Sequence, residues 1–330
     1  MNKMTKKLLL SVLTVVLTVI ALGTTTFAWF TLTNTATVQP FEAEVVADTG
    51  IEVSLNDAEN DNIWVTTITT AMIDRYLEVK YPEGVFFNAV TSLTGRNMYA
   101  FGNYIDALLQ NSPQFINIGI QFQSNNATEI IWEEATIIQD PAQSNDWITD
   151  VGFIPTTGVA VAGGDTLNID ASNGMRISAD DGASNIFVYE KGGVALGTNA
   201  TPGGNTVLGG LTNASVTVDA FGVFGGNTAL VNGAISYYYE KTAELPTGAN
   251  DITVAQTFTD FAGAIPGDAN TTVVNQRTIL TLTPGGVASA TATYSGTLVI
   301  RIWLEGWDPD TYNALLARTL RATLRFTSPE

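Results

Sequence analysis

The sequence predicts an all-β protein: a mostly antiparallel β-sandwich with a Gly-rich β insertion, preceded by an N-terminal hydrophobic helix. Three observations support this prediction. Apolar and polar residues alternate with a period of two through most of the chain, which is typical of half-buried strands. More than half of the 30 glycines fall between residues 157 and 250, where turns are therefore dense. An uncharged apolar run lies close to the N-terminus.

The N-terminus has the layout of a secretion signal. Three lysines within the first seven residues precede an apolar run from Leu8 to Leu22, and small residues follow at 23–28. A basic segment, a short apolar segment and a small-residue cut site define such signals. The apolar run is short for a helix that crosses a bilayer, which needs roughly 20 residues. We expect residues 1–28 to be a signal peptide that directs export; the alternative is an uncleaved membrane anchor.

Composition argues against several classes of function. The chain has no His and no Cys, so it contains neither a Ser-His-Asp nor a Cys-His catalytic arrangement and no His-based zinc site. Glu133 and Glu134 are adjacent, and on a strand they would point to opposite faces instead of forming an acid pair. We therefore expect no enzymatic activity. With 32 Asp and Glu against 14 Lys and Arg, the chain is acidic and should repel nucleic acids.

Trp29–Val38 is the first predicted strand. Phe30, Leu32, Ala36 and Val38 would lie on one face and the threonines at 31, 33, 35 and 37 on the other. Alternating β-branched threonines favour an extended strand. Pro40 marks an edge, a bulge or a change of pairing partner, after which the alternation resumes in the opposite phase.

The remaining elements follow from the same pattern. Further strands are predicted at Ile51–Leu55, Ile63–Thr70, Tyr76–Tyr81, Phe115–Phe122 and Ile130–Ile138. Short helices are predicted at Tyr99–Leu109 and at Pro309–Ala317, where Asp308 would cap the helix and Pro309 would open it.

Residues 157–250 differ from the rest of the chain. Short apolar stretches at 186–189, 214–224 and 234–239 stand between glycine-rich tracts. They contain strand-forming residues, which favours a β-rich insertion or second lobe over a loosely ordered excursion. The sandwich core is then formed by residues 29–156 and 251–330.

The most regular alternation lies near the C-terminus. Leu298–Glu305 and Leu320–Thr327 each place four apolar residues on one face, which predicts half-buried antiparallel strands with one wet face. A turn and a short helix would join them, and we expect this pair to lie centrally in one sheet.

The N-terminal region resembles a known family. A lysine-rich start, an apolar run, small residues and then Ala28-Trp29-Phe30-Thr31 are similar to exported surface proteins of Firmicutes and their wall-less relatives that carry a SipW-type signal. The best-known members are the TasA and camelysin group of biofilm-matrix fibre proteins. The closing segment 300–308 resembles a tail common in such surface proteins. This resemblance implies cleavage after Ala28, a jelly-roll-like sandwich, and a mature N-terminal strand that completes a neighbouring subunit's sheet. The segment 157–250 has no counterpart in that pattern.

A strand close to a new N-terminus is tethered at one end only. It can pair with its own sheet or with that of another chain, and head-to-tail pairing between chains propagates a filament. We therefore expect an extracellular, cell-surface structural protein that polymerises with itself through Trp29, Phe30, Leu32, Ala36 and Val38. It would contact a membrane only through its N-terminal segment before processing. The alternatives are that this strand is simply the first of its own sandwich, and that the protein is a monomeric membrane-anchored adhesin or carbohydrate-binding module.

Calcium is the only cofactor that the sequence suggests. Asp140, Asp146 and Asp150 fall in predicted loops, and Ca²⁺ takes carboxylate and carbonyl oxygens. Asp57, Asp61 and the pair Asp180-Asp181 fall in further predicted loops. No tract has the spacing of a calcium loop, so solvated loop charge is the alternative.

Aromatic residues also invite a surface role. On a strand, Tyr237-Tyr238-Tyr239 would expose at least one ring, and Trp303 and Trp307 flank a predicted turn. Such rings could form a subunit contact or a glycan platform, and packing in the core is the alternative.

Overall fold

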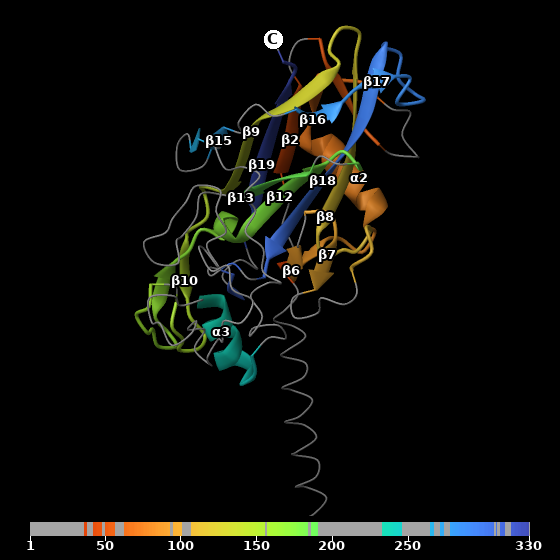
Figure 1. The fold of residues 1–330 in the computed structure, drawn as a ribbon. Helices are drawn as coiled ribbons and strands as arrows, with labels where there is room; N and C mark the ends of the chain where they lie inside the picture. The colour runs from red at the N-terminus through yellow and green to blue at the C-terminus, as the bar shows by residue number, and fades with distance from the viewer. Residues whose placement is uncertain are drawn as a thin grey trace, which may run out of the picture.

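The computed structural model of the 330-residue chain describes residues 36–37, 42–47, 50–56, 63–92, 95–100, 107–155, 157–183, 186–190, 233–245, 265–266, 271–273, 278–306, 308, 311–313 and 318–329. Within these residues the protein is mostly β, with two large sheets (Figure 1). The all-β prediction is confirmed. The predicted signal segment 1–28, the predicted cut site at Ala28 and residues 29–35 lie outside the described residues.

One large sheet is built around β18 (Tyr294–Glu305), and we call it the β18 sheet. Along one edge of β18 lie β12 and then β13; along the other lie β8 and then β3. Shorter strands pair at the two ends of β18, with β6 parallel to it. The partners are β12 (Met175–Asp180), β13 (Ile186–Glu190), β8 (Ile116–Ser124), β3 (Glu52–Leu55), β6 (Ala89–Ser92), β7 (Met98–Ala100) and β17 (Thr283–Pro284).

The other large sheet is built around β19 (Leu320–Thr327), and we call it the β19 sheet. β9 pairs antiparallel along one edge of β19, and β2 pairs parallel along the other. Most other pairs in both sheets are antiparallel, as the sequence predicted. Further strands extend the β19 sheet beyond β2 and β9. The strands around β19 are β9 (Glu129–Gln139), β2 (Glu42–Ala47), β4 (Thr67–Ile68), β14 (Ile265–Pro266), β15 (Thr271–Val273) and β16 (Thr278–Thr281).

The hydrophobic core lies between these sheets. Phe122 of β8 meets Phe326 of β19 edge to face, with ring centroids 5.2 Å apart, and Trp132 of β9 lies against the same Phe326 ring. All three side chains are fully buried. Because burying a large apolar side chain stabilises a fold by about 1.5–3 kcal/mol, this three-ring contact is a main connection between the sheets.

The C-terminal strands are placed differently from the prediction. β18 and β19 do not share a sheet: each is central in its own, so the segment between them crosses from one layer to the other. The alternation of β19 is confirmed, since Leu320, Ala322, Leu324 and Phe326 are buried and the arginines at 321 and 325 are exposed. The predicted wet face of β18 is wrong at its C-terminal end, where Arg301, Trp303 and Glu305 are buried under other parts of the chain.

Both described α-helices occur where strands were predicted. Tyr76–Tyr81 belongs largely to α2 (Thr70–Lys80), and residues 234–239 belong to α3 (Gly233–Thr242). In α2, Ile73 and Tyr76 are one turn apart and are both buried. A short run rich in aromatic and aliphatic residues satisfies a strand and a helix pattern equally well, and tertiary packing decides between them.

The short helix predicted at Tyr99–Leu109 is not observed in its described residues, whereas in Pro309–Ala317 the described Asn313 has a 3₁₀ conformation. Tyr99 and Ala100 end β7, and Ala107 bridges back to Tyr99 as an antiparallel partner. Residues 101–106 and most of Pro309–Ala317 lie outside the described residues.

Part of the segment expected to be an insertion belongs to the sandwich. β12 and β13 pair into the β18 sheet. Among the described strands of this segment, β11 (Thr166–Asn168) lies apart from the large sheets and pairs with β10 (Asp146–Ile148) in a small sheet. Residues 191–232 lie outside the described part of the chain.

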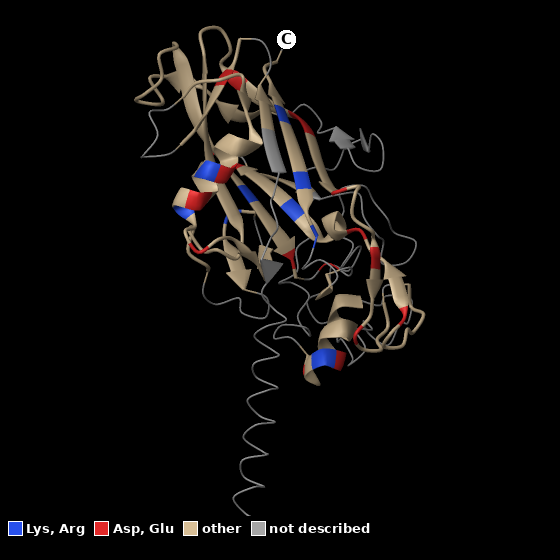
Figure 2. Ribbon diagram, turned by 180° about the vertical axis from the view of Figure 1, so that it is seen from behind, with Lys and Arg blue, Asp and Glu red and all other residues tan. Residues whose placement is uncertain are grey.

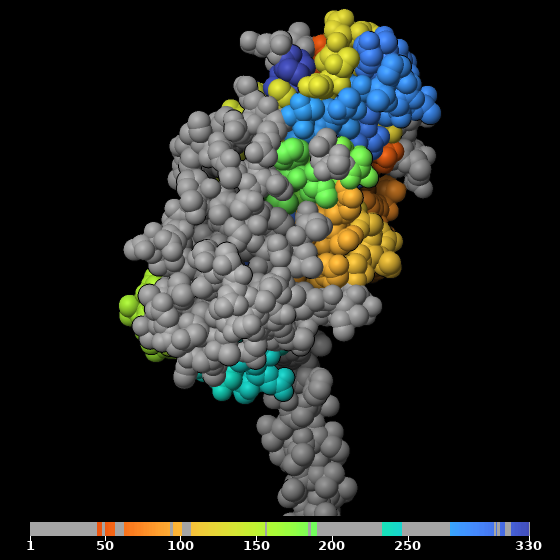
Figure 3. Space-filling model, viewed as in Figure 1, coloured from red at the N-terminus to blue at the C-terminus, as the bar shows by residue number. Residues whose placement is uncertain are grey.

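Loop residues cover the β18 sheet near Gln123 of β8. The backbone N–H groups of Thr291 and Ala292 donate to the side-chain oxygen of Gln123, at 2.8 and 3.1 Å. In Figure 3 the blue residues of the β17 region lie next to the yellow residues at the top of the molecule. Gln123 on β8 is thereby buried and its oxygen is hydrogen-bonded.

Candidate assembly site

The structure describes the C-terminal end of the predicted assembly strand. β1 (Ala36–Thr37) pairs antiparallel with β5 (Phe86–Phe87), with Ala36 opposite Phe87 and Thr37 opposite Phe86. This two-stranded sheet is separate from both large sheets. Of the five predicted assembly residues, Ala36 therefore lies on β1 opposite Phe87 of β5, whereas Trp29, Phe30, Leu32 and Val38 lie outside the described residues.

β5 is held in place from the side opposite to β1. The backbone N–H of Phe86 donates to the carbonyl of Pro113 at 2.7 Å, and the side chain of Phe87 is buried in the core. The N–H and C=O groups of one strand residue point to the same edge of the strand, and those of Phe86 point towards Pro113. Phe86 and Thr37 are therefore a non-hydrogen-bonded pair in the antiparallel β1–β5 ladder. The edge of β5 that pairs with β1 is thus held in place by contacts other than β1.

Helix α2 covers the neighbouring edge of β8. β3 pairs with β8 only over residues 120–123, and side chains from α2 and the residue after it satisfy part of the edge below. The hydroxyls of Tyr81 and Tyr76 accept from the N–H groups of Asn117 and Gly119, at 3.1 and 3.3 Å. Lys80 Nζ donates to the carbonyl of Asn117 at 2.5 Å. These bonds replace a missing strand partner, which protects a sheet edge.

The ammonium of Lys80 stands in an unusual environment. It lies 5.5 Å from the ring centre of Tyr76 and 5.7 Å from that of Tyr81. Burial and the nearby charge of Arg301 lower the pKa of Lys80 to about 8. This amine is therefore mostly charged at neutral pH and loses its charge just above it.

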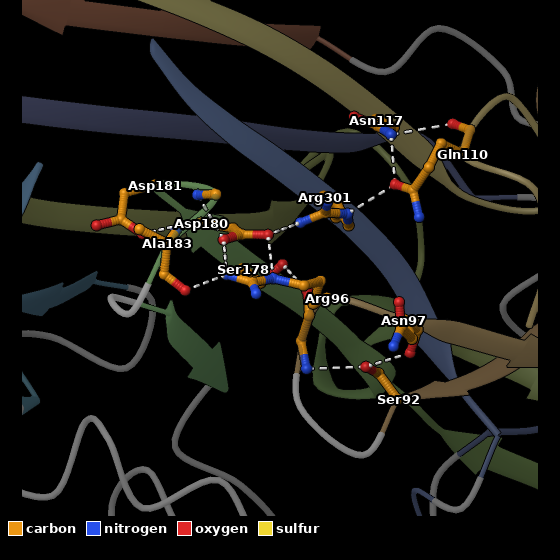
Figure 4. A network of polar contacts seen from close by, with 12 residues as sticks. Ser92, Arg96, Asn97, Gln110, Asn117, Ser178, Asp180, Asp181, Ala183 and Arg301 are labelled. Atoms are coloured by element: carbon orange, nitrogen blue, oxygen red, sulfur yellow. Dashed lines mark hydrogen bonds and ion pairs between the residues drawn. The ribbon is translucent and has the colours of Figure 1, made fainter. Parts of the chain in front are cut away.

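A buried polar network anchors the same part of β8 (Figure 4). Arg301 of β18 donates to the carboxylate of Asp180 at 2.9 Å and to Gln110 Oε1 at 3.1 Å. Gln110 in turn accepts from the side-chain amide of Asn117 at 2.9 Å. The side chains of Arg301 and Asp180 are 7% and 2% exposed. The network therefore ties β12, β18 and β8 together across the face of the sheet that points away from the core.

Asp180 is the acceptor at the centre of this network. A second arginine, Arg96, makes two bonds to its carboxylate, at 2.7 and 3.0 Å, and the N–H of Gly182 adds a fourth donor. Burial alone would raise the pKa of Asp180, but the hydrogen bonds from Arg96, Gly182 and Arg301 outweigh it and lower this pKa. Asp180 is thus a structural anion.

A second buried pair closes the lower end of the same face. Arg176 of β12 donates to Asp308 at 2.7 Å, and the indole N–H of Trp303 donates to the carboxylate of Glu305 at 3.0 Å. Figure 2 shows basic residues on the strands of the sandwich and on both helices. Much of this positive charge is paired within the fold, although the chain as a whole is acidic.

The three calcium candidates are not brought together. Asp140 lies 3.5 Å from Arg321, and Asp146 accepts from Asn168. Asp150 accepts from the hydroxyl of Tyr237 at 3.0 Å and from Lys241 at 2.6 Å, which lie one turn apart on α3. Within the described ranges no group of three or more acidic residues is arranged to hold a metal ion. Asp57 and Asp61 lie outside those ranges.

Two of the aromatic candidates, Tyr237 and Trp303, pack inward, whereas Tyr238 and Tyr239 are half-buried. Tyr237 belongs to a cluster with Trp147, Phe153 and Tyr312, in which the rings of Trp147 and Tyr312 stack 5.8 Å apart. Tyr237 and Trp303 are buried, so neither presents a ring for a glycan. Trp307 lies outside the described residues.

Comparison with protein-family models, with curated proteins and with solved structures finds no match for this chain. No helix in the described part of the chain is long and apolar enough to span a bilayer.

Sequence reasoning missed several residues of this site. β5 is two residues long, too short for a period to be recognised, and Lys80 was assigned to a strand. A weak signal existed for Arg301, because a charged residue within an apolar alternation of twelve strand residues requires either solvent or a partner.

Proposed function

We propose that this protein is an extracellular structural protein of the cell surface that polymerises into filaments or matrix fibres, by donating its N-terminal strand (Trp29–Val38) to a neighbouring subunit. One observation carries the proposal. β1, the described end of that strand, pairs with β5 in a separate two-stranded sheet and belongs to neither large sheet. Both large sheets have their strand order without β1, which supports a role for the N-terminal strand in a neighbouring subunit.

The pairing of β1 and of β2 supports the same conclusion. β2 is paired with β19 over six residues, from Glu42 to Ala47, whereas β1 is paired with β5 over two. Main-chain hydrogen bonds supply much of the affinity of an added strand. β1 is therefore the more easily released of the two. The export signal expected at residues 1–28 would place the free strand at the start of the mature chain.

Electron microscopy with N-terminal sequencing tests this function. Negatively stained material released from producing cells should contain filaments, and their subunits should begin at or near Trp29. Discrete particles that still carry Leu8–Leu22 would overturn the proposal and favour a monomeric membrane-anchored adhesin or carbohydrate-binding module.

Two substitutions on the strand provide a matched pair of variants. Leu32→Asp puts a charge on the apolar face that would fill pockets of the neighbouring subunit, whereas Thr33→Asp puts the same charge on the opposite face. Filaments should be lost for Leu32→Asp and retained for Thr33→Asp, with both subunits folded by circular dichroism. Equal assembly of the two variants would contradict a one-faced donor strand.

A further inference from the structure

We propose that β5 (Phe86–Phe87) is the acceptor for the C-terminal end of the donor strand, so that Ala36–Thr37 of one copy pair with β5 of the next copy in the register seen within one chain. This inference rests on the proposed function and adds the location and register of the contact between copies.

The first argument is that the chain already makes this pairing with itself. Thr37 lies opposite Phe86 and Ala36 opposite Phe87. If a neighbouring copy supplies the same strand, the same two residue pairs form, and no new surface has to evolve. Exchange of an identical element between copies therefore changes the connectivity and leaves the local contact unchanged.

The second argument concerns the link between β1 and β2. Four residues, 38–41, separate Thr37 from Glu42, and Pro40 is one of them. A short link of this kind favours exchange between copies, because the strand on one side can leave while the strand on the other side stays anchored. β2 is that anchor, since it lies between β19 and β4 in the β19 sheet.

The third argument is that the acceptor does not depend on the donor. Phe86 is bonded to Pro113, and Phe87 is buried in the core. A few residues beyond Pro113, Asn117 is secured by Gln110, Lys80 and Tyr81. A preorganised edge loses little conformational freedom when a strand binds, which favours association.

The geometry of the exchange gives an open assembly. Each copy offers one donor at its N-terminus and one acceptor at β5, which are different surfaces. Such a heterologous contact forms a filament unless the rotation between copies closes a ring.

Disulfide trapping tests the proposal, and the absence of native Cys makes it clean. Thr37→Cys is combined with Phe86→Cys, because Cα atoms of a pair of this type lie about 4.5 Å apart, within reach of a disulfide. The matched control combines Thr37→Cys with Glu83→Cys. Glu83 is exposed and three residues before Phe86, which places it up to roughly 10 Å further along the chain.

After assembly and mild oxidation, the Thr37/Phe86 variant should give a ladder of covalent multimers on a non-reducing gel, at least tenfold above the control. Mass spectrometry of the monomer band distinguishes a disulfide within one chain. Filaments that contain only such intrachain disulfides, or no more multimers than the control, would overturn β5 as the acceptor and leave the proposed function intact. Failure of the wild-type chain to form filaments would overturn both.

A second pair protects the test against misfolding at Phe86. Val38→Cys with Val85→Cys is the next pair that the same antiparallel register would form. Covalent multimers from this pair support the register, and their absence in well-formed filaments of that variant argues against it.

Discussion

Replacing Asp180 by Asn should destabilise the fold strongly, because Asp180 holds two arginines on the covered face of the β18 sheet. Its carboxylate accepts from Arg96, Arg301 and the N–H of Gly182, and its side chain is 2% exposed. Asn keeps one oxygen but replaces the other by an amide that faces guanidinium groups. Arg301, 7% exposed, would then be left buried with Gln110 as its remaining partner on that side.

Breaking a buried ion pair by removing one partner costs about 3–5 kcal/mol. Arg96 is 33% exposed and can turn to water, so its share of the loss is small. We therefore expect the lower end of that range, about 3 kcal/mol of unfolding free energy. The neighbouring Asp181→Asn provides the control: its carboxylate accepts from the N–H of Ala183 in an exposed turn, and its loss should cost less than about 1 kcal/mol.

Urea unfolding of the chain beginning at Trp29, followed by tryptophan fluorescence, measures both variants. Arg301→Met in the Asp180→Asn background should recover part of the loss, because it removes the unpaired buried charge. Equal losses for Asp180→Asn and Asp181→Asn, or no recovery with Arg301→Met, would refute the reasoning.

The lowered pKa of Asp180 adds a pH dependence to the same experiment. A carboxylate whose pKa is lower in the folded state binds fewer protons there than in the unfolded chain. Its stabilising contribution is complete above the unfolded value near 3.8 and is lost as the pH falls through the lower folded value. The free-energy difference between wild type and Asp180→Asn should therefore shrink below about pH 4.

Three further predictions concern other parts of the fold. Gly95→Ala should lower the unfolding free energy by about 1–3 kcal/mol more than Gly182→Ala. Both glycines have positive φ, but a Cβ at Gly95 would lie 2.6 Å from Val188, whereas the space around Gly182 is open. Thermal unfolding of the two variants measures the difference. As the pH rises from about 8 to 10.5, the unfolding free energy of the wild type should increase relative to that of Lys80→Met. In this range the Lys80 amine keeps its proton in the unfolded chain but has lost it in the folded protein. A pH-independent difference in urea unfolding would contradict this. Phe326→Ala should cost about 3–5 kcal/mol through the cavity it leaves between the sheets, and a loss below 1 kcal/mol would show that this contact does not join them.

Much of the fold could be predicted from local pattern alone. The strands expected at residues 51–55, 115–122 and 130–138 correspond closely to β3, β8 and β9. The period of two along a strand follows from which residues face the core, and it is written directly in the order of apolar and polar residues. α2 and α3 were mistaken for strands because a stretch of only ten or eleven residues fits both periods.

The candidate site was predictable only in part. The export-like N-terminus and the strand after it were visible in the sequence, and Ala36 does lie on a strand. Its partner β5 was not visible, since fifty residues separate Ala36 from Phe86 and no local rule links them. The sequence predicts Asp180 to be a loop charge, because its two arginine partners, Arg96 and Arg301, lie far from it along the chain and no local pattern reveals them.

By itself, the sequence determined the all-β class, the missing catalytic chemistry of His and Cys, and the face of β19 that points inward. These properties depend on composition or on neighbours along the chain. Only the tertiary structure decided that β18 and β19 lie in different sheets, that Arg301 and Trp303 are covered, and that β1 rests on β5. Strand partners are chosen by burial and hydrogen bonding between segments far apart in the chain, and an alternating pattern shows that a strand has a buried face without showing which segment covers it.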